Sequence, residues 1–578
     1  MSEVISTKPA ASHPVPPETS PATSVATSVD VFAVYGVEPE IQAYAMAKYS
    51  RSALSMKESL KEITLQKAEK FLNTFYFQYG HRSIADLAHI AIAIERLSIL
   101  AAIAVADEQR WDGQERSTRY QDFRKSGYYT PNFENDIAKN GVLINNAAAA
   151  SAQTLYRETI DSLFATYEKV SQRTFEYFVS ITPRPAEMQP DVYERTLRAR
   201  AFDVARYLLP LATNTSIGEI VNARTLENQV AHLLSQPHKE VRDLGALLKQ
   251  AAVSPAYNAN EESLRALIAG IRAVSPALAE RAERELLREV RVAPTLVKYA
   301  DPNAYEIETR RELQQAAAAL MQAAAIEPAP LVDLLDNDLL SNNLREDDAF
   351  EIELATTLLY GHCHYSYRQL RKNIAAAGAA RRREIVDLGL RHRGPHDELL
   401  RPFSAGQQFR FDILMDIGGF RDMHRHRRCV QIMQEFTTVH GFDTPPEVEA
   451  AGVRSDYEAA MQRAESAVLQ LSASAAKNSG TNNVGSNNVG RNNDVDHCYE
   501  AAQNAQYVIP FAFRKRALFK MDFAEAVYIS ELRTTPAGHA SYRNVAYAMY
   551  QAVAKKYPAL SKYFRVHDVR EPVDLLKR

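Results

Sequence analysis

The hexapeptide Ala205-Arg206-Tyr207-Leu208-Leu209-Pro210 has a counterpart far downstream, Ala505-Gln506-Tyr507-Val508-Ile509-Pro510. Both keep the alanine, the tyrosine and the proline, with aliphatic residues between the last two. A second pair of segments agrees with the first: an aromatic run ends in Gly80-His81, and another apolar run ends in Gly361-His362. Because similarity at the scale of a domain dictates the architecture, the sequence predicts two copies of one domain.

Changes in composition give the boundaries of the two copies. Residues 1–28 are mostly Pro, Ser, Thr, Val and Ala and predict a disordered tail. We predict copy one over 29–255, a helical linker over 256–290, copy two over 291–560 and a C-terminal tail over 561–578. Copy two is longer through an Arg-rich insertion at about 371–407 and an Asn/Gly-rich stretch at 478–494, which predicts a flexible loop.

Length and charge limit the classes of protein that the chain can represent. With 578 residues the chain is too long for a single core, so two domains are expected. The formal net charge is −3, which gives no global field toward nucleic acid or anionic lipid, and we expect neither as a partner. Three cysteines and no apparent signal segment predict a reducing compartment, most simply the cytoplasm.

The most apolar stretch runs from Ala85 to Ala106. Four charged or titratable residues interrupt it and exclude a membrane span, namely Asp86, His89, Glu95 and Arg96. We therefore predict a buried helix, with Ile90, Ile92 and Leu97 among its core positions.

The segment Gln114–Tyr120 places Glu115, Ser117 and Arg119 two residues apart. If the segment is extended, the three side chains project to one side. A carboxylate, a hydroxyl and a guanidinium in a row suit a nucleotide, because an arginine fork holds phosphate through paired hydrogen bonds. The alternative is a solvated edge of alternating charge.

The segment His424–Arg428 contains five consecutive cationic or titratable side chains and follows an apolar run that is broken by Gly418-Gly419. Such a cluster repels itself unless an anion compensates it, which predicts a phosphate or an electron-rich cofactor. A solvated basic face is the alternative. The histidines and cysteines lack the CxxC or HExxH spacing typical of zinc, so we predict no metal.

Laid over each other, the two segments resemble the signature of flavin-dependent thymidylate synthases: Arg-His-Arg, two residues, Ser, and later Glu or Gln, any residue, Ser, any residue, Arg, Tyr. Copy one matches the later part with Glu115, Ser117, Arg119 and Tyr120, whereas Asp107-Glu108-Gln109 stand where Arg-His-Arg belongs. Copy two matches the first part with Arg425-His426-Arg427, whereas Met433, Glu435, Thr437 and Thr438 occupy the later positions.

The division continues toward the C-terminal end of each copy. Copy one keeps the family's Arg206, Asn222, Arg224 and Asn228 but has Leu233 at the final arginine position. Copy two has other residues at the positions that correspond to these four, but it has an arginine, Arg533, at the final position. Random decay would remove matching positions from both copies, so complementary losses predict composite sites formed between the copies.

The resemblance implies which residues bind which ligand. Glu115, Ser117, Arg119, Arg206, Arg425 and Arg533 would bind dUMP. Arg425, His426 and Arg427 would form the catalytic, flavin-facing group, and Asn222, Arg224 and Asn228 would contact the adenine-nucleotide part of FAD. The implied reaction converts dUMP to dTMP with methylenetetrahydrofolate and reduced FAD, with NADPH as electron donor and no protein nucleophile.

The resemblance also implies the architecture: an α/β protein with two helix-rich copies, each built around an antiparallel sheet, and a homodimer that mimics the family's tetramer. The rival interpretation is a non-catalytic relic that binds a nucleotide or flavin, because Asp86-Leu87 and Asp422 stand where the family has Glu-His and Gln. Nucleic-acid binding through the arginine clusters lacks the net basic charge that it requires.

Overall fold

The computed structural model describes residues 32, 34, 36–48, 55–62, 82–133, 146–298, 300–304, 306–307, 330–335, 346–360, 373–391, 403, 409–478 and 503–577. The predicted N-terminal tail, both Gly-His pairs and all but the first residue of the Asn/Gly-rich stretch lie outside these residues.

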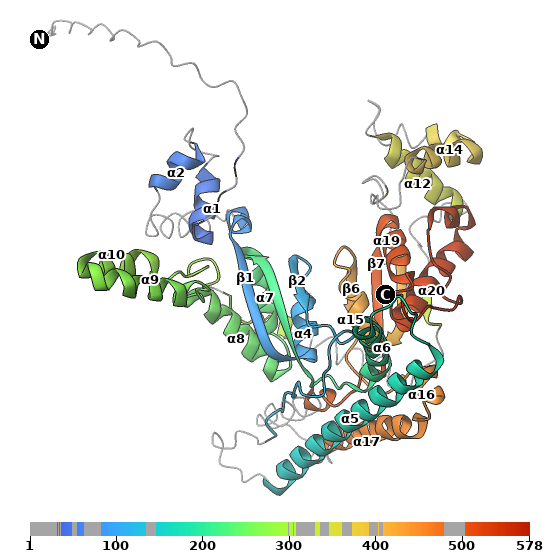
Figure 1. Cartoon of the computed structure of the whole chain (residues 1–578). Coiled ribbons are helices and arrows are strands. Elements are labelled where there is room, and N and C mark those ends of the chain that lie inside the picture. The colour runs from blue at the N-terminus through green and yellow to red at the C-terminus, as the bar shows by residue number, and fades with distance from the viewer. Residues whose placement is uncertain are drawn as a thin grey trace, which may run out of the picture.

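In the first part of the chain, the described residues form three strands and a set of surrounding helices (Figure 1). Its strands are β1 (His89–Ser98), β2 (Trp111–Glu115) and β3 (Asn214–Asn222). Its helices are α1 (Pro39–Lys48), α2 (Met56–Glu62), η2 (Arg82–Leu87), α4 (Ile99–Ala106), α5 (Asn146–Ile181), α6 (Pro190–Ala205), η4 (Arg206–Leu208), α7 (Ala223–Leu234) and α8 (Lys239–Val253). Two further helices, α9 (Glu261–Val274) and α10 (Pro276–Leu286), form a projecting hairpin.

The second part repeats this order of elements. Its strands are β4 (Val332–Leu335), β5 (Phe409–Asp416), β6 (Val430–Met433) and β7 (Arg514–Met521). Its helices are α12 (Glu346–Tyr360), α14 (Ala379–Leu390), α15 (Ile417–Met423), α16 (Pro446–Ala450), α17 (Arg454–Asn478), α19 (Phe523–Thr534), α20 (Ala540–Lys556) and η7 (Pro558–Tyr563). By order, β1, β3 and β2 correspond to β5, β7 and β6, and α4, α5, α7 and α8 correspond to α15, α17, α19 and α20.

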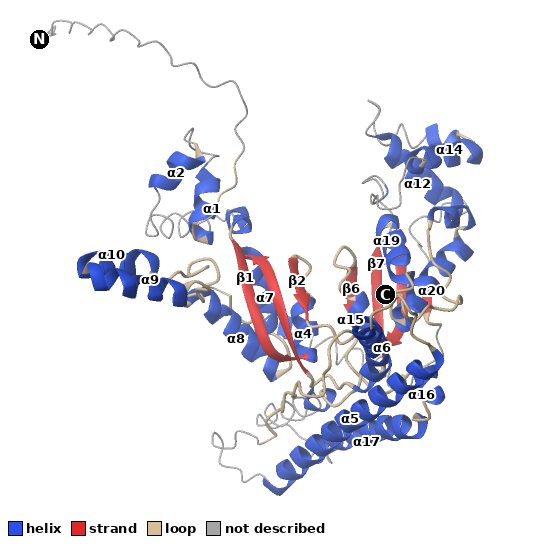
Figure 2. Ribbon diagram, in the orientation of Figure 1, coloured by secondary structure: helices blue, strands red, loops and turns tan. Residues whose placement is uncertain are grey.

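Both sheets are antiparallel, with strand orders β1-β3-β2 and β4-β5-β7-β6 (Figure 2). Strand β7 shows the alternation of a half-buried strand, because every second residue from Lys515 to Met521 is buried. The long helices α5 and α17 pack against each other beneath the sheets. The prediction of two helix-rich copies with antiparallel sheets is confirmed.

The repeated hexapeptides form the seam between the copies. Pro210 and Pro510 make an antiparallel bridge, and four backbone hydrogen bonds flank it. The N–H of Leu211 donates to the carbonyl of Ile509, and in return the N–H of Phe511 donates to the carbonyl of Leu209. In a second reciprocal pair, the N–H of Ala212 donates to the carbonyl of Tyr507, and the N–H of Ala512 donates to the carbonyl of Tyr207. Equivalent atoms therefore exchange hydrogen bonds, as expected of two copies related by an approximate two-fold axis.

The prediction of one buried helix over Ala85–Ala106 is wrong. The structure has strand β1 followed by helix α4, which Ser98 caps by accepting a hydrogen bond from the Ala101 N–H. A bulge interrupts the pairing of β1 with β3 between Glu95 and Leu97, and Arg96 has φ 62°. The extra residue shifts the inward-facing position after Ile94 from 96 to 97, so that the buried positions 90, 94 and 97 have a spacing that imitates one face of a helix.

The C-terminal residues 573–577 lie against α6. The guanidinium of Arg200 donates hydrogen bonds to the carbonyl oxygens of Asp574, Leu575 and Lys577. The side chains of Leu575 and Leu576 pack against the hydrophobic core. The end of the chain is therefore attached to copy one, although it follows copy two in sequence.

Candidate functional site

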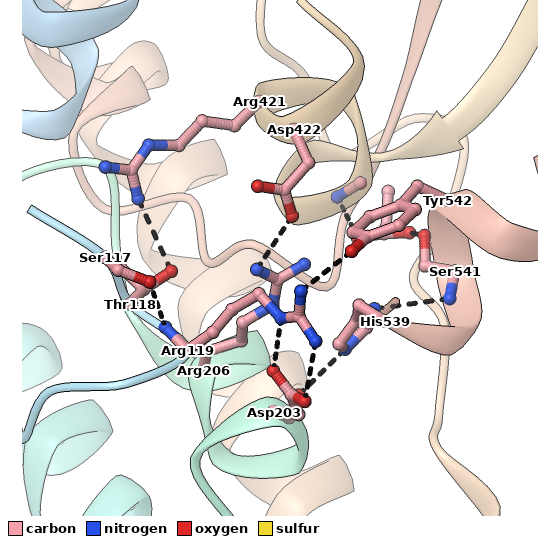
Figure 3. Close-up of polar contacts among 12 residues, drawn as sticks. Ser117, Thr118, Arg119, Asp203, Arg206, Arg421, Asp422, His539, Ser541 and Tyr542 are labelled. Atoms are coloured by element: carbon pink, nitrogen blue, oxygen red, sulfur yellow. Dashed lines mark hydrogen bonds and ion pairs between the residues drawn. The ribbon is translucent and has the colours of Figure 1, made fainter. Parts of the chain in front are cut away.

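Charged side chains from both copies meet near the seam (Figure 3). Copy one contributes the turn after β2, the C-terminal end of α6 and the start of η4. Copy two contributes α15 with the residues that follow it, the end of α19 and the start of α20. We call the following eight residues the arginine cluster: Arg119, Arg206, Arg421, Arg425, Arg533, Glu115, Asp203 and Asp422.

Helix α15 can pack against α20 because of its two glycines. Asp416 caps the helix: its carboxylate accepts a hydrogen bond from the Gly419 N–H at 2.7 Å and another from the Ser541 hydroxyl. A Cβ atom on Gly419 would overlap with the Ser541 Oγ, and one on Gly418 would lie 3.3 Å from the ring of Phe511. Burial raises the pKa of Asp416 to about 6, in spite of these hydrogen bonds. The Gly-Gly pair thus positions the basic segment that follows.

Arg119 is buried and contacts both copies. Its Nε and Nη2 donate to the two carboxylate oxygens of Asp203 at 2.7 and 3.2 Å. Its Nη1 donates to the Tyr542 hydroxyl at 2.7 Å, and Nη2 also donates to the carbonyl of Ala537 at 2.9 Å. Burial opposes the charge of Arg119, but Asp203 outweighs it and raises the pKa of the guanidinium. The Ser117 Oγ accepts from the Arg119 N–H at 3.3 Å and fixes the turn.

Arg206 is 2% exposed and donates from Nη1 to Asp422 Oδ2 at 3.0 Å. Among the described residues, no acceptor forms a hydrogen bond with its Nε or Nη2 atom. Buried donors of this kind are rare in folded proteins unless a ligand or water satisfies them. Burial alone would raise the pKa of Asp422, but the charges of Arg206, Arg425, Arg119 and Arg533 lower it well below its ordinary value. Asp422 is therefore ionised.

Glu115 joins two arginines of the other copy. Its Oε1 accepts from Nε of Arg421 at 2.9 Å and from Nη2 of the same side chain, and its Oε2 accepts from Arg425 at 3.2 Å. Arg421 is 5% exposed, whereas the Arg425 side chain is 40% exposed. Arg425 can therefore reach a ligand, while Arg421 is committed to the protein.

His426 is buried and supports Arg533. Its Nε2 accepts a hydrogen bond from Arg533 Nε at 2.7 Å, which assigns the proton to Nδ1, 3.5 Å from Glu525 Oε1. Burial lowers the pKa of His426, so the ring is neutral. The guanidinium carbons of Arg119 and Arg533 lie 5.6 and 5.3 Å from the ring centroid of Tyr542. Tyr542 thus holds one arginine from each copy.

A cavity of about 530 Å³ lies beside the arginine cluster, between α7 and the segment after α15. It is lined by Asn228 and Arg427, two of the residues expected to contact the flavin. Arg427 also pairs with Asp112 at 3.1 Å and lies over the ring of Trp111. Two more of the expected residues lie at the start of α7: Asn222 caps that helix, and Arg224 pairs with Asp86 at 2.9 Å.

The arginine cluster carries an excess of positive charge. Five guanidiniums face three carboxylates, which leaves two positive charges once every group is ionised. The neutral ring of His426 adds none. Three of the five guanidiniums, those of Arg119, Arg206 and Arg421, are buried, so an excess of charge here is costly unless an anion compensates it.

Sequence reasoning missed Asp203, Arg421 and Tyr542. Asp203 lies one helical turn before Arg206, and Arg421 one turn before Arg425, so their spacing gave a weak signal. Tyr542 had none, because its role depends on how α20 packs against copy one. Of the three cysteines, the structure describes Cys429, which is buried, with its pKa raised to about 12 by burial.

Fold and site together define a duplicated, helix-rich protein with a cluster of arginines and carboxylates shared between its copies. The family model described as "Thymidylate synthase complementing protein" matches residues 34–255 and again residues 349–559. The chain therefore belongs to the flavin-dependent thymidylate synthase family, in an internally duplicated form.

Three relatives illustrate the range of similarity. A UPF0159 protein of Chlamydia pneumoniae is 26% identical over 94% of this chain and 93% of its own length. A UPF0159 protein of Thermoplasma acidophilum is 24% identical over 90% of this chain and 94% of its own length. A flavin-dependent thymidylate synthase of Clostridium tetani is 25% identical over 36% of this chain and 76% of its own length.

Two further properties concern the described residues alone. None of their helices is both long and apolar enough to cross a membrane. No three His, Cys, Asp or Glu side chains among them are grouped so as to hold a metal ion.

Proposed function

We propose that the protein is a flavin-dependent thymidylate synthase that converts dUMP to dTMP with methylenetetrahydrofolate and FAD. The composite site would be the arginine cluster with the adjacent cavity. The observation that carries the proposal is that Arg119 and Arg206 of copy one lie in one cluster with Arg425 and Arg533 of copy two. These are the arginines that the family uses for dUMP.

The charge of the cluster suits this substrate. A phosphate monoester carries about −1.5 to −2 charges at neutral pH, which matches the excess of two positive charges. Arg206 supplies two buried donors that a ligand oxygen would satisfy. Arginine forks fix such oxygens in a defined geometry and polarise a pyrimidine ring without any change of protonation.

The described residues offer no thiol nucleophile for this chemistry. The Cys429 Sγ donates to the carbonyl of His426 at 2.9 Å, and its raised pKa keeps it a thiol. The residues of the cluster would bind and orient the substrate and exclude water. His426 would act as a positioning residue for Arg533, since both of its nitrogens face protein groups.

The residues of the cavity fit a polar ring system such as that of a flavin. His424 is 4% exposed and Gln229 is 2% exposed, and both line the cavity. His424 Nε2 lies 3.6 Å from Asp107 Oδ1, which also lines the cavity. Gln229 Oε1 has no hydrogen-bond partner among the described residues, so it offers an acceptor to a ligand, with Arg427 and Asn228 nearby. When bound, reduced FAD would supply the hydride for the reaction; NADPH would be its electron donor.

We also propose a homodimer in which two chains replace the four subunits of the family. Each chain would then contribute one arginine cluster. The positions equivalent to Arg206 and Arg533 in the opposite copy are Gln506 and Leu233, and neither can bind an anion by charge.

The proposal is tested by nucleotide binding to FAD-loaded protein, followed through the flavin absorbance spectrum. Arg119→Ala and Arg533→Ala should each weaken dUMP binding at least about 100-fold, because each removes a charge-assisted contact in a desolvated site. Arg454→Ala is the matched control, since Arg454 lies at the exposed start of α17 and pairs only with Glu449 and Glu458 among the described residues. Normal dUMP affinity in either cluster variant would contradict the proposal that both copies contribute to one binding site.

A non-catalytic binding protein is the second candidate, and the environment of Asp86 favours it. Asp86 occupies a position where the family has the glutamate of a Glu-His pair, and its carboxylate is tied to Arg224. Formation of dTMP from dUMP and methylenetetrahydrofolate under reducing conditions separates the two candidates. A protein that binds FAD and dUMP but forms no dTMP is the relic.

A further inference from the structure

Asp422 is the acidic residue of the arginine cluster that sequence comparison does not explain. It lies in the last turn of α15, and its side chain is 14% exposed. Counted from the capping residues Ser98 and Asp416, the equivalent position in copy one is Ala104. The carboxylate therefore belongs to one composite site and has no counterpart in the other.

The other two carboxylates of the cluster are committed to particular arginines. Asp203 binds Arg119 through both oxygens, and Glu115 bridges Arg421 and Arg425. Asp422 makes one hydrogen bond to Arg206 while standing in the field of four guanidiniums. Removing its carboxylate would leave Arg206 Nη1 without this partner, in addition to Nε and Nη2, which already lack one among the described residues.

The charge of Asp422 decides the net charge that a ligand meets. With it, the cluster has two uncompensated positive charges, and without it, three. A diphosphate group carries roughly one more negative charge than a monophosphate, and unit charges a few ångströms apart in a protein interact strongly. An ionised carboxylate beside the ligand thus repels the additional charge of a diphosphate.

We propose that Asp422 is a specificity-determining residue that restricts the arginine cluster to phosphate monoesters and excludes diphosphates. The inference rests on the proposed function, because it specifies the ligand of the same site. In the alternative, a structural role, Asp422 would only hold Arg206 in place, and replacing its carboxylate would not change the relative affinities for monophosphates and diphosphates.

The test compares Asp422→Asn, which keeps an acceptor for Arg206 but removes the charge, with Asp422→Glu, which keeps the charge. Affinities for dUMP and dUDP are measured by calorimetry at one ionic strength on the full chain. We expect the wild type to prefer dUMP by about tenfold or more. Asp422→Asn should shift the ratio toward dUDP by about tenfold, whereas Asp422→Glu should change it less than about threefold.

Two further measurements keep the inference independent of folding and of the nucleotide. If Asp422→Asn fails to fold, Asp422→Gln, which removes the same charge by placing the family's glutamine at this position, should shift the dUMP to dUDP ratio in the same direction. Inorganic phosphate and pyrophosphate form a second pair of probes.

An unchanged ratio of dUMP to dUDP affinity in a folded Asp422→Asn protein overturns the inference and leaves the proposed function intact. A wild-type protein that discriminates phosphate from pyrophosphate but binds no dUMP overturns the proposed function alone, and one that binds none of the four overturns both.

Discussion

The side chain of Arg119 links the two copies, because it forms hydrogen bonds with both. Its guanidinium is held by a carboxylate of copy one and by a hydroxyl and a carbonyl of copy two. The carbonyl of Asp203 in turn faces the ring of His539, which caps α20 by accepting from the Ser541 N–H. The buried histidine therefore fixes the backbone beside the residue that orients Arg119.

His539 gives a testable dependence of stability on pH. Burial lowers its pKa to about 3, whereas the unfolded chain has an ordinary histidine pKa near 6.5. The unfolded state then binds more protons in this window, so stability falls as the pH drops below about 6.5. Between pH 7 and 5 the wild type should lose on the order of 2 kcal/mol through this group.

The measurement is urea unfolding at both pH values for wild type, His539→Asn and the control His567→Asn at an exposed position. We expect His539→Asn to show a pH dependence smaller by that amount, while asparagine still caps the helix. Equal pH dependence in all three proteins would contradict the assignment of a neutral buried His539.

At the scale of elements, short helix α15 carries the basic segment and depends on close packing. It has seven residues, so its own hydrogen bonds contribute little, and the cap by Asp416 with the contact to α20 must hold it. The equivalent helix α4 has a serine cap and no glycine, and its hydroxyl binds Glu240 of α8. In copy one the helix cap is a hydroxyl and its partner on α8 is a carboxylate. In copy two the cap, Asp416, is the carboxylate and its partner on α20, Ser541, is the hydroxyl.

Gly419→Ala tests whether this contact positions the site. The added Cβ would overlap with the Ser541 Oγ, so we expect a loss of about 1–3 kcal/mol in stability and weaker dUMP binding. Gly218→Ala in β3 is the matched control, because a Cβ there meets nothing within 4 Å. Chemical denaturation and dUMP titration give the readouts. Identical behaviour of both variants would show that α15 tolerates displacement from α20.

At the scale of the whole molecule, the seam unites the copies into one hydrophobic core. Leu209 and Ile509 are fully buried, and the core that contains them includes residues of both sheets. The backbone hydrogen bonds between the two hexapeptides lie within this core and are protected from water. Neither copy can open at the seam without exposing apolar surface of the other.

Leu209→Ala should therefore destabilise both copies together. Removing a fully buried leucine costs about 2–5 kcal/mol. We expect calorimetry to show a single transition shifted to lower temperature, whereas Leu267→Ala, at a position 55% exposed on α9, should leave it within about 0.5 kcal/mol. Two separated transitions in the Leu209 variant would mean that the copies unfold independently.

Three features could be predicted from the amino-acid sequence: the duplication of the chain, the high helix content of its copies, and the arginines that each copy retains. These features are local: repeated hexapeptides and motif residues are visible without knowing the fold. The sequence misassigned β1, because the bulge at Arg96 converts a strand period into a helical one. It could not identify Asp203 or Tyr542 as partners of Arg119, since no pattern links positions so far apart in the chain.

Tertiary structure alone decided the electrostatic character of the site. Asp422 is one acidic residue among many in the sequence, and burial among four arginines makes it the group that sets the net charge. Likewise, packing against Glu525 and Arg533 makes His426, the central histidine of the basic motif, a neutral support for Arg533. The physical reason is that charge interactions depend on distance and burial in three dimensions, which sequence spacing does not specify.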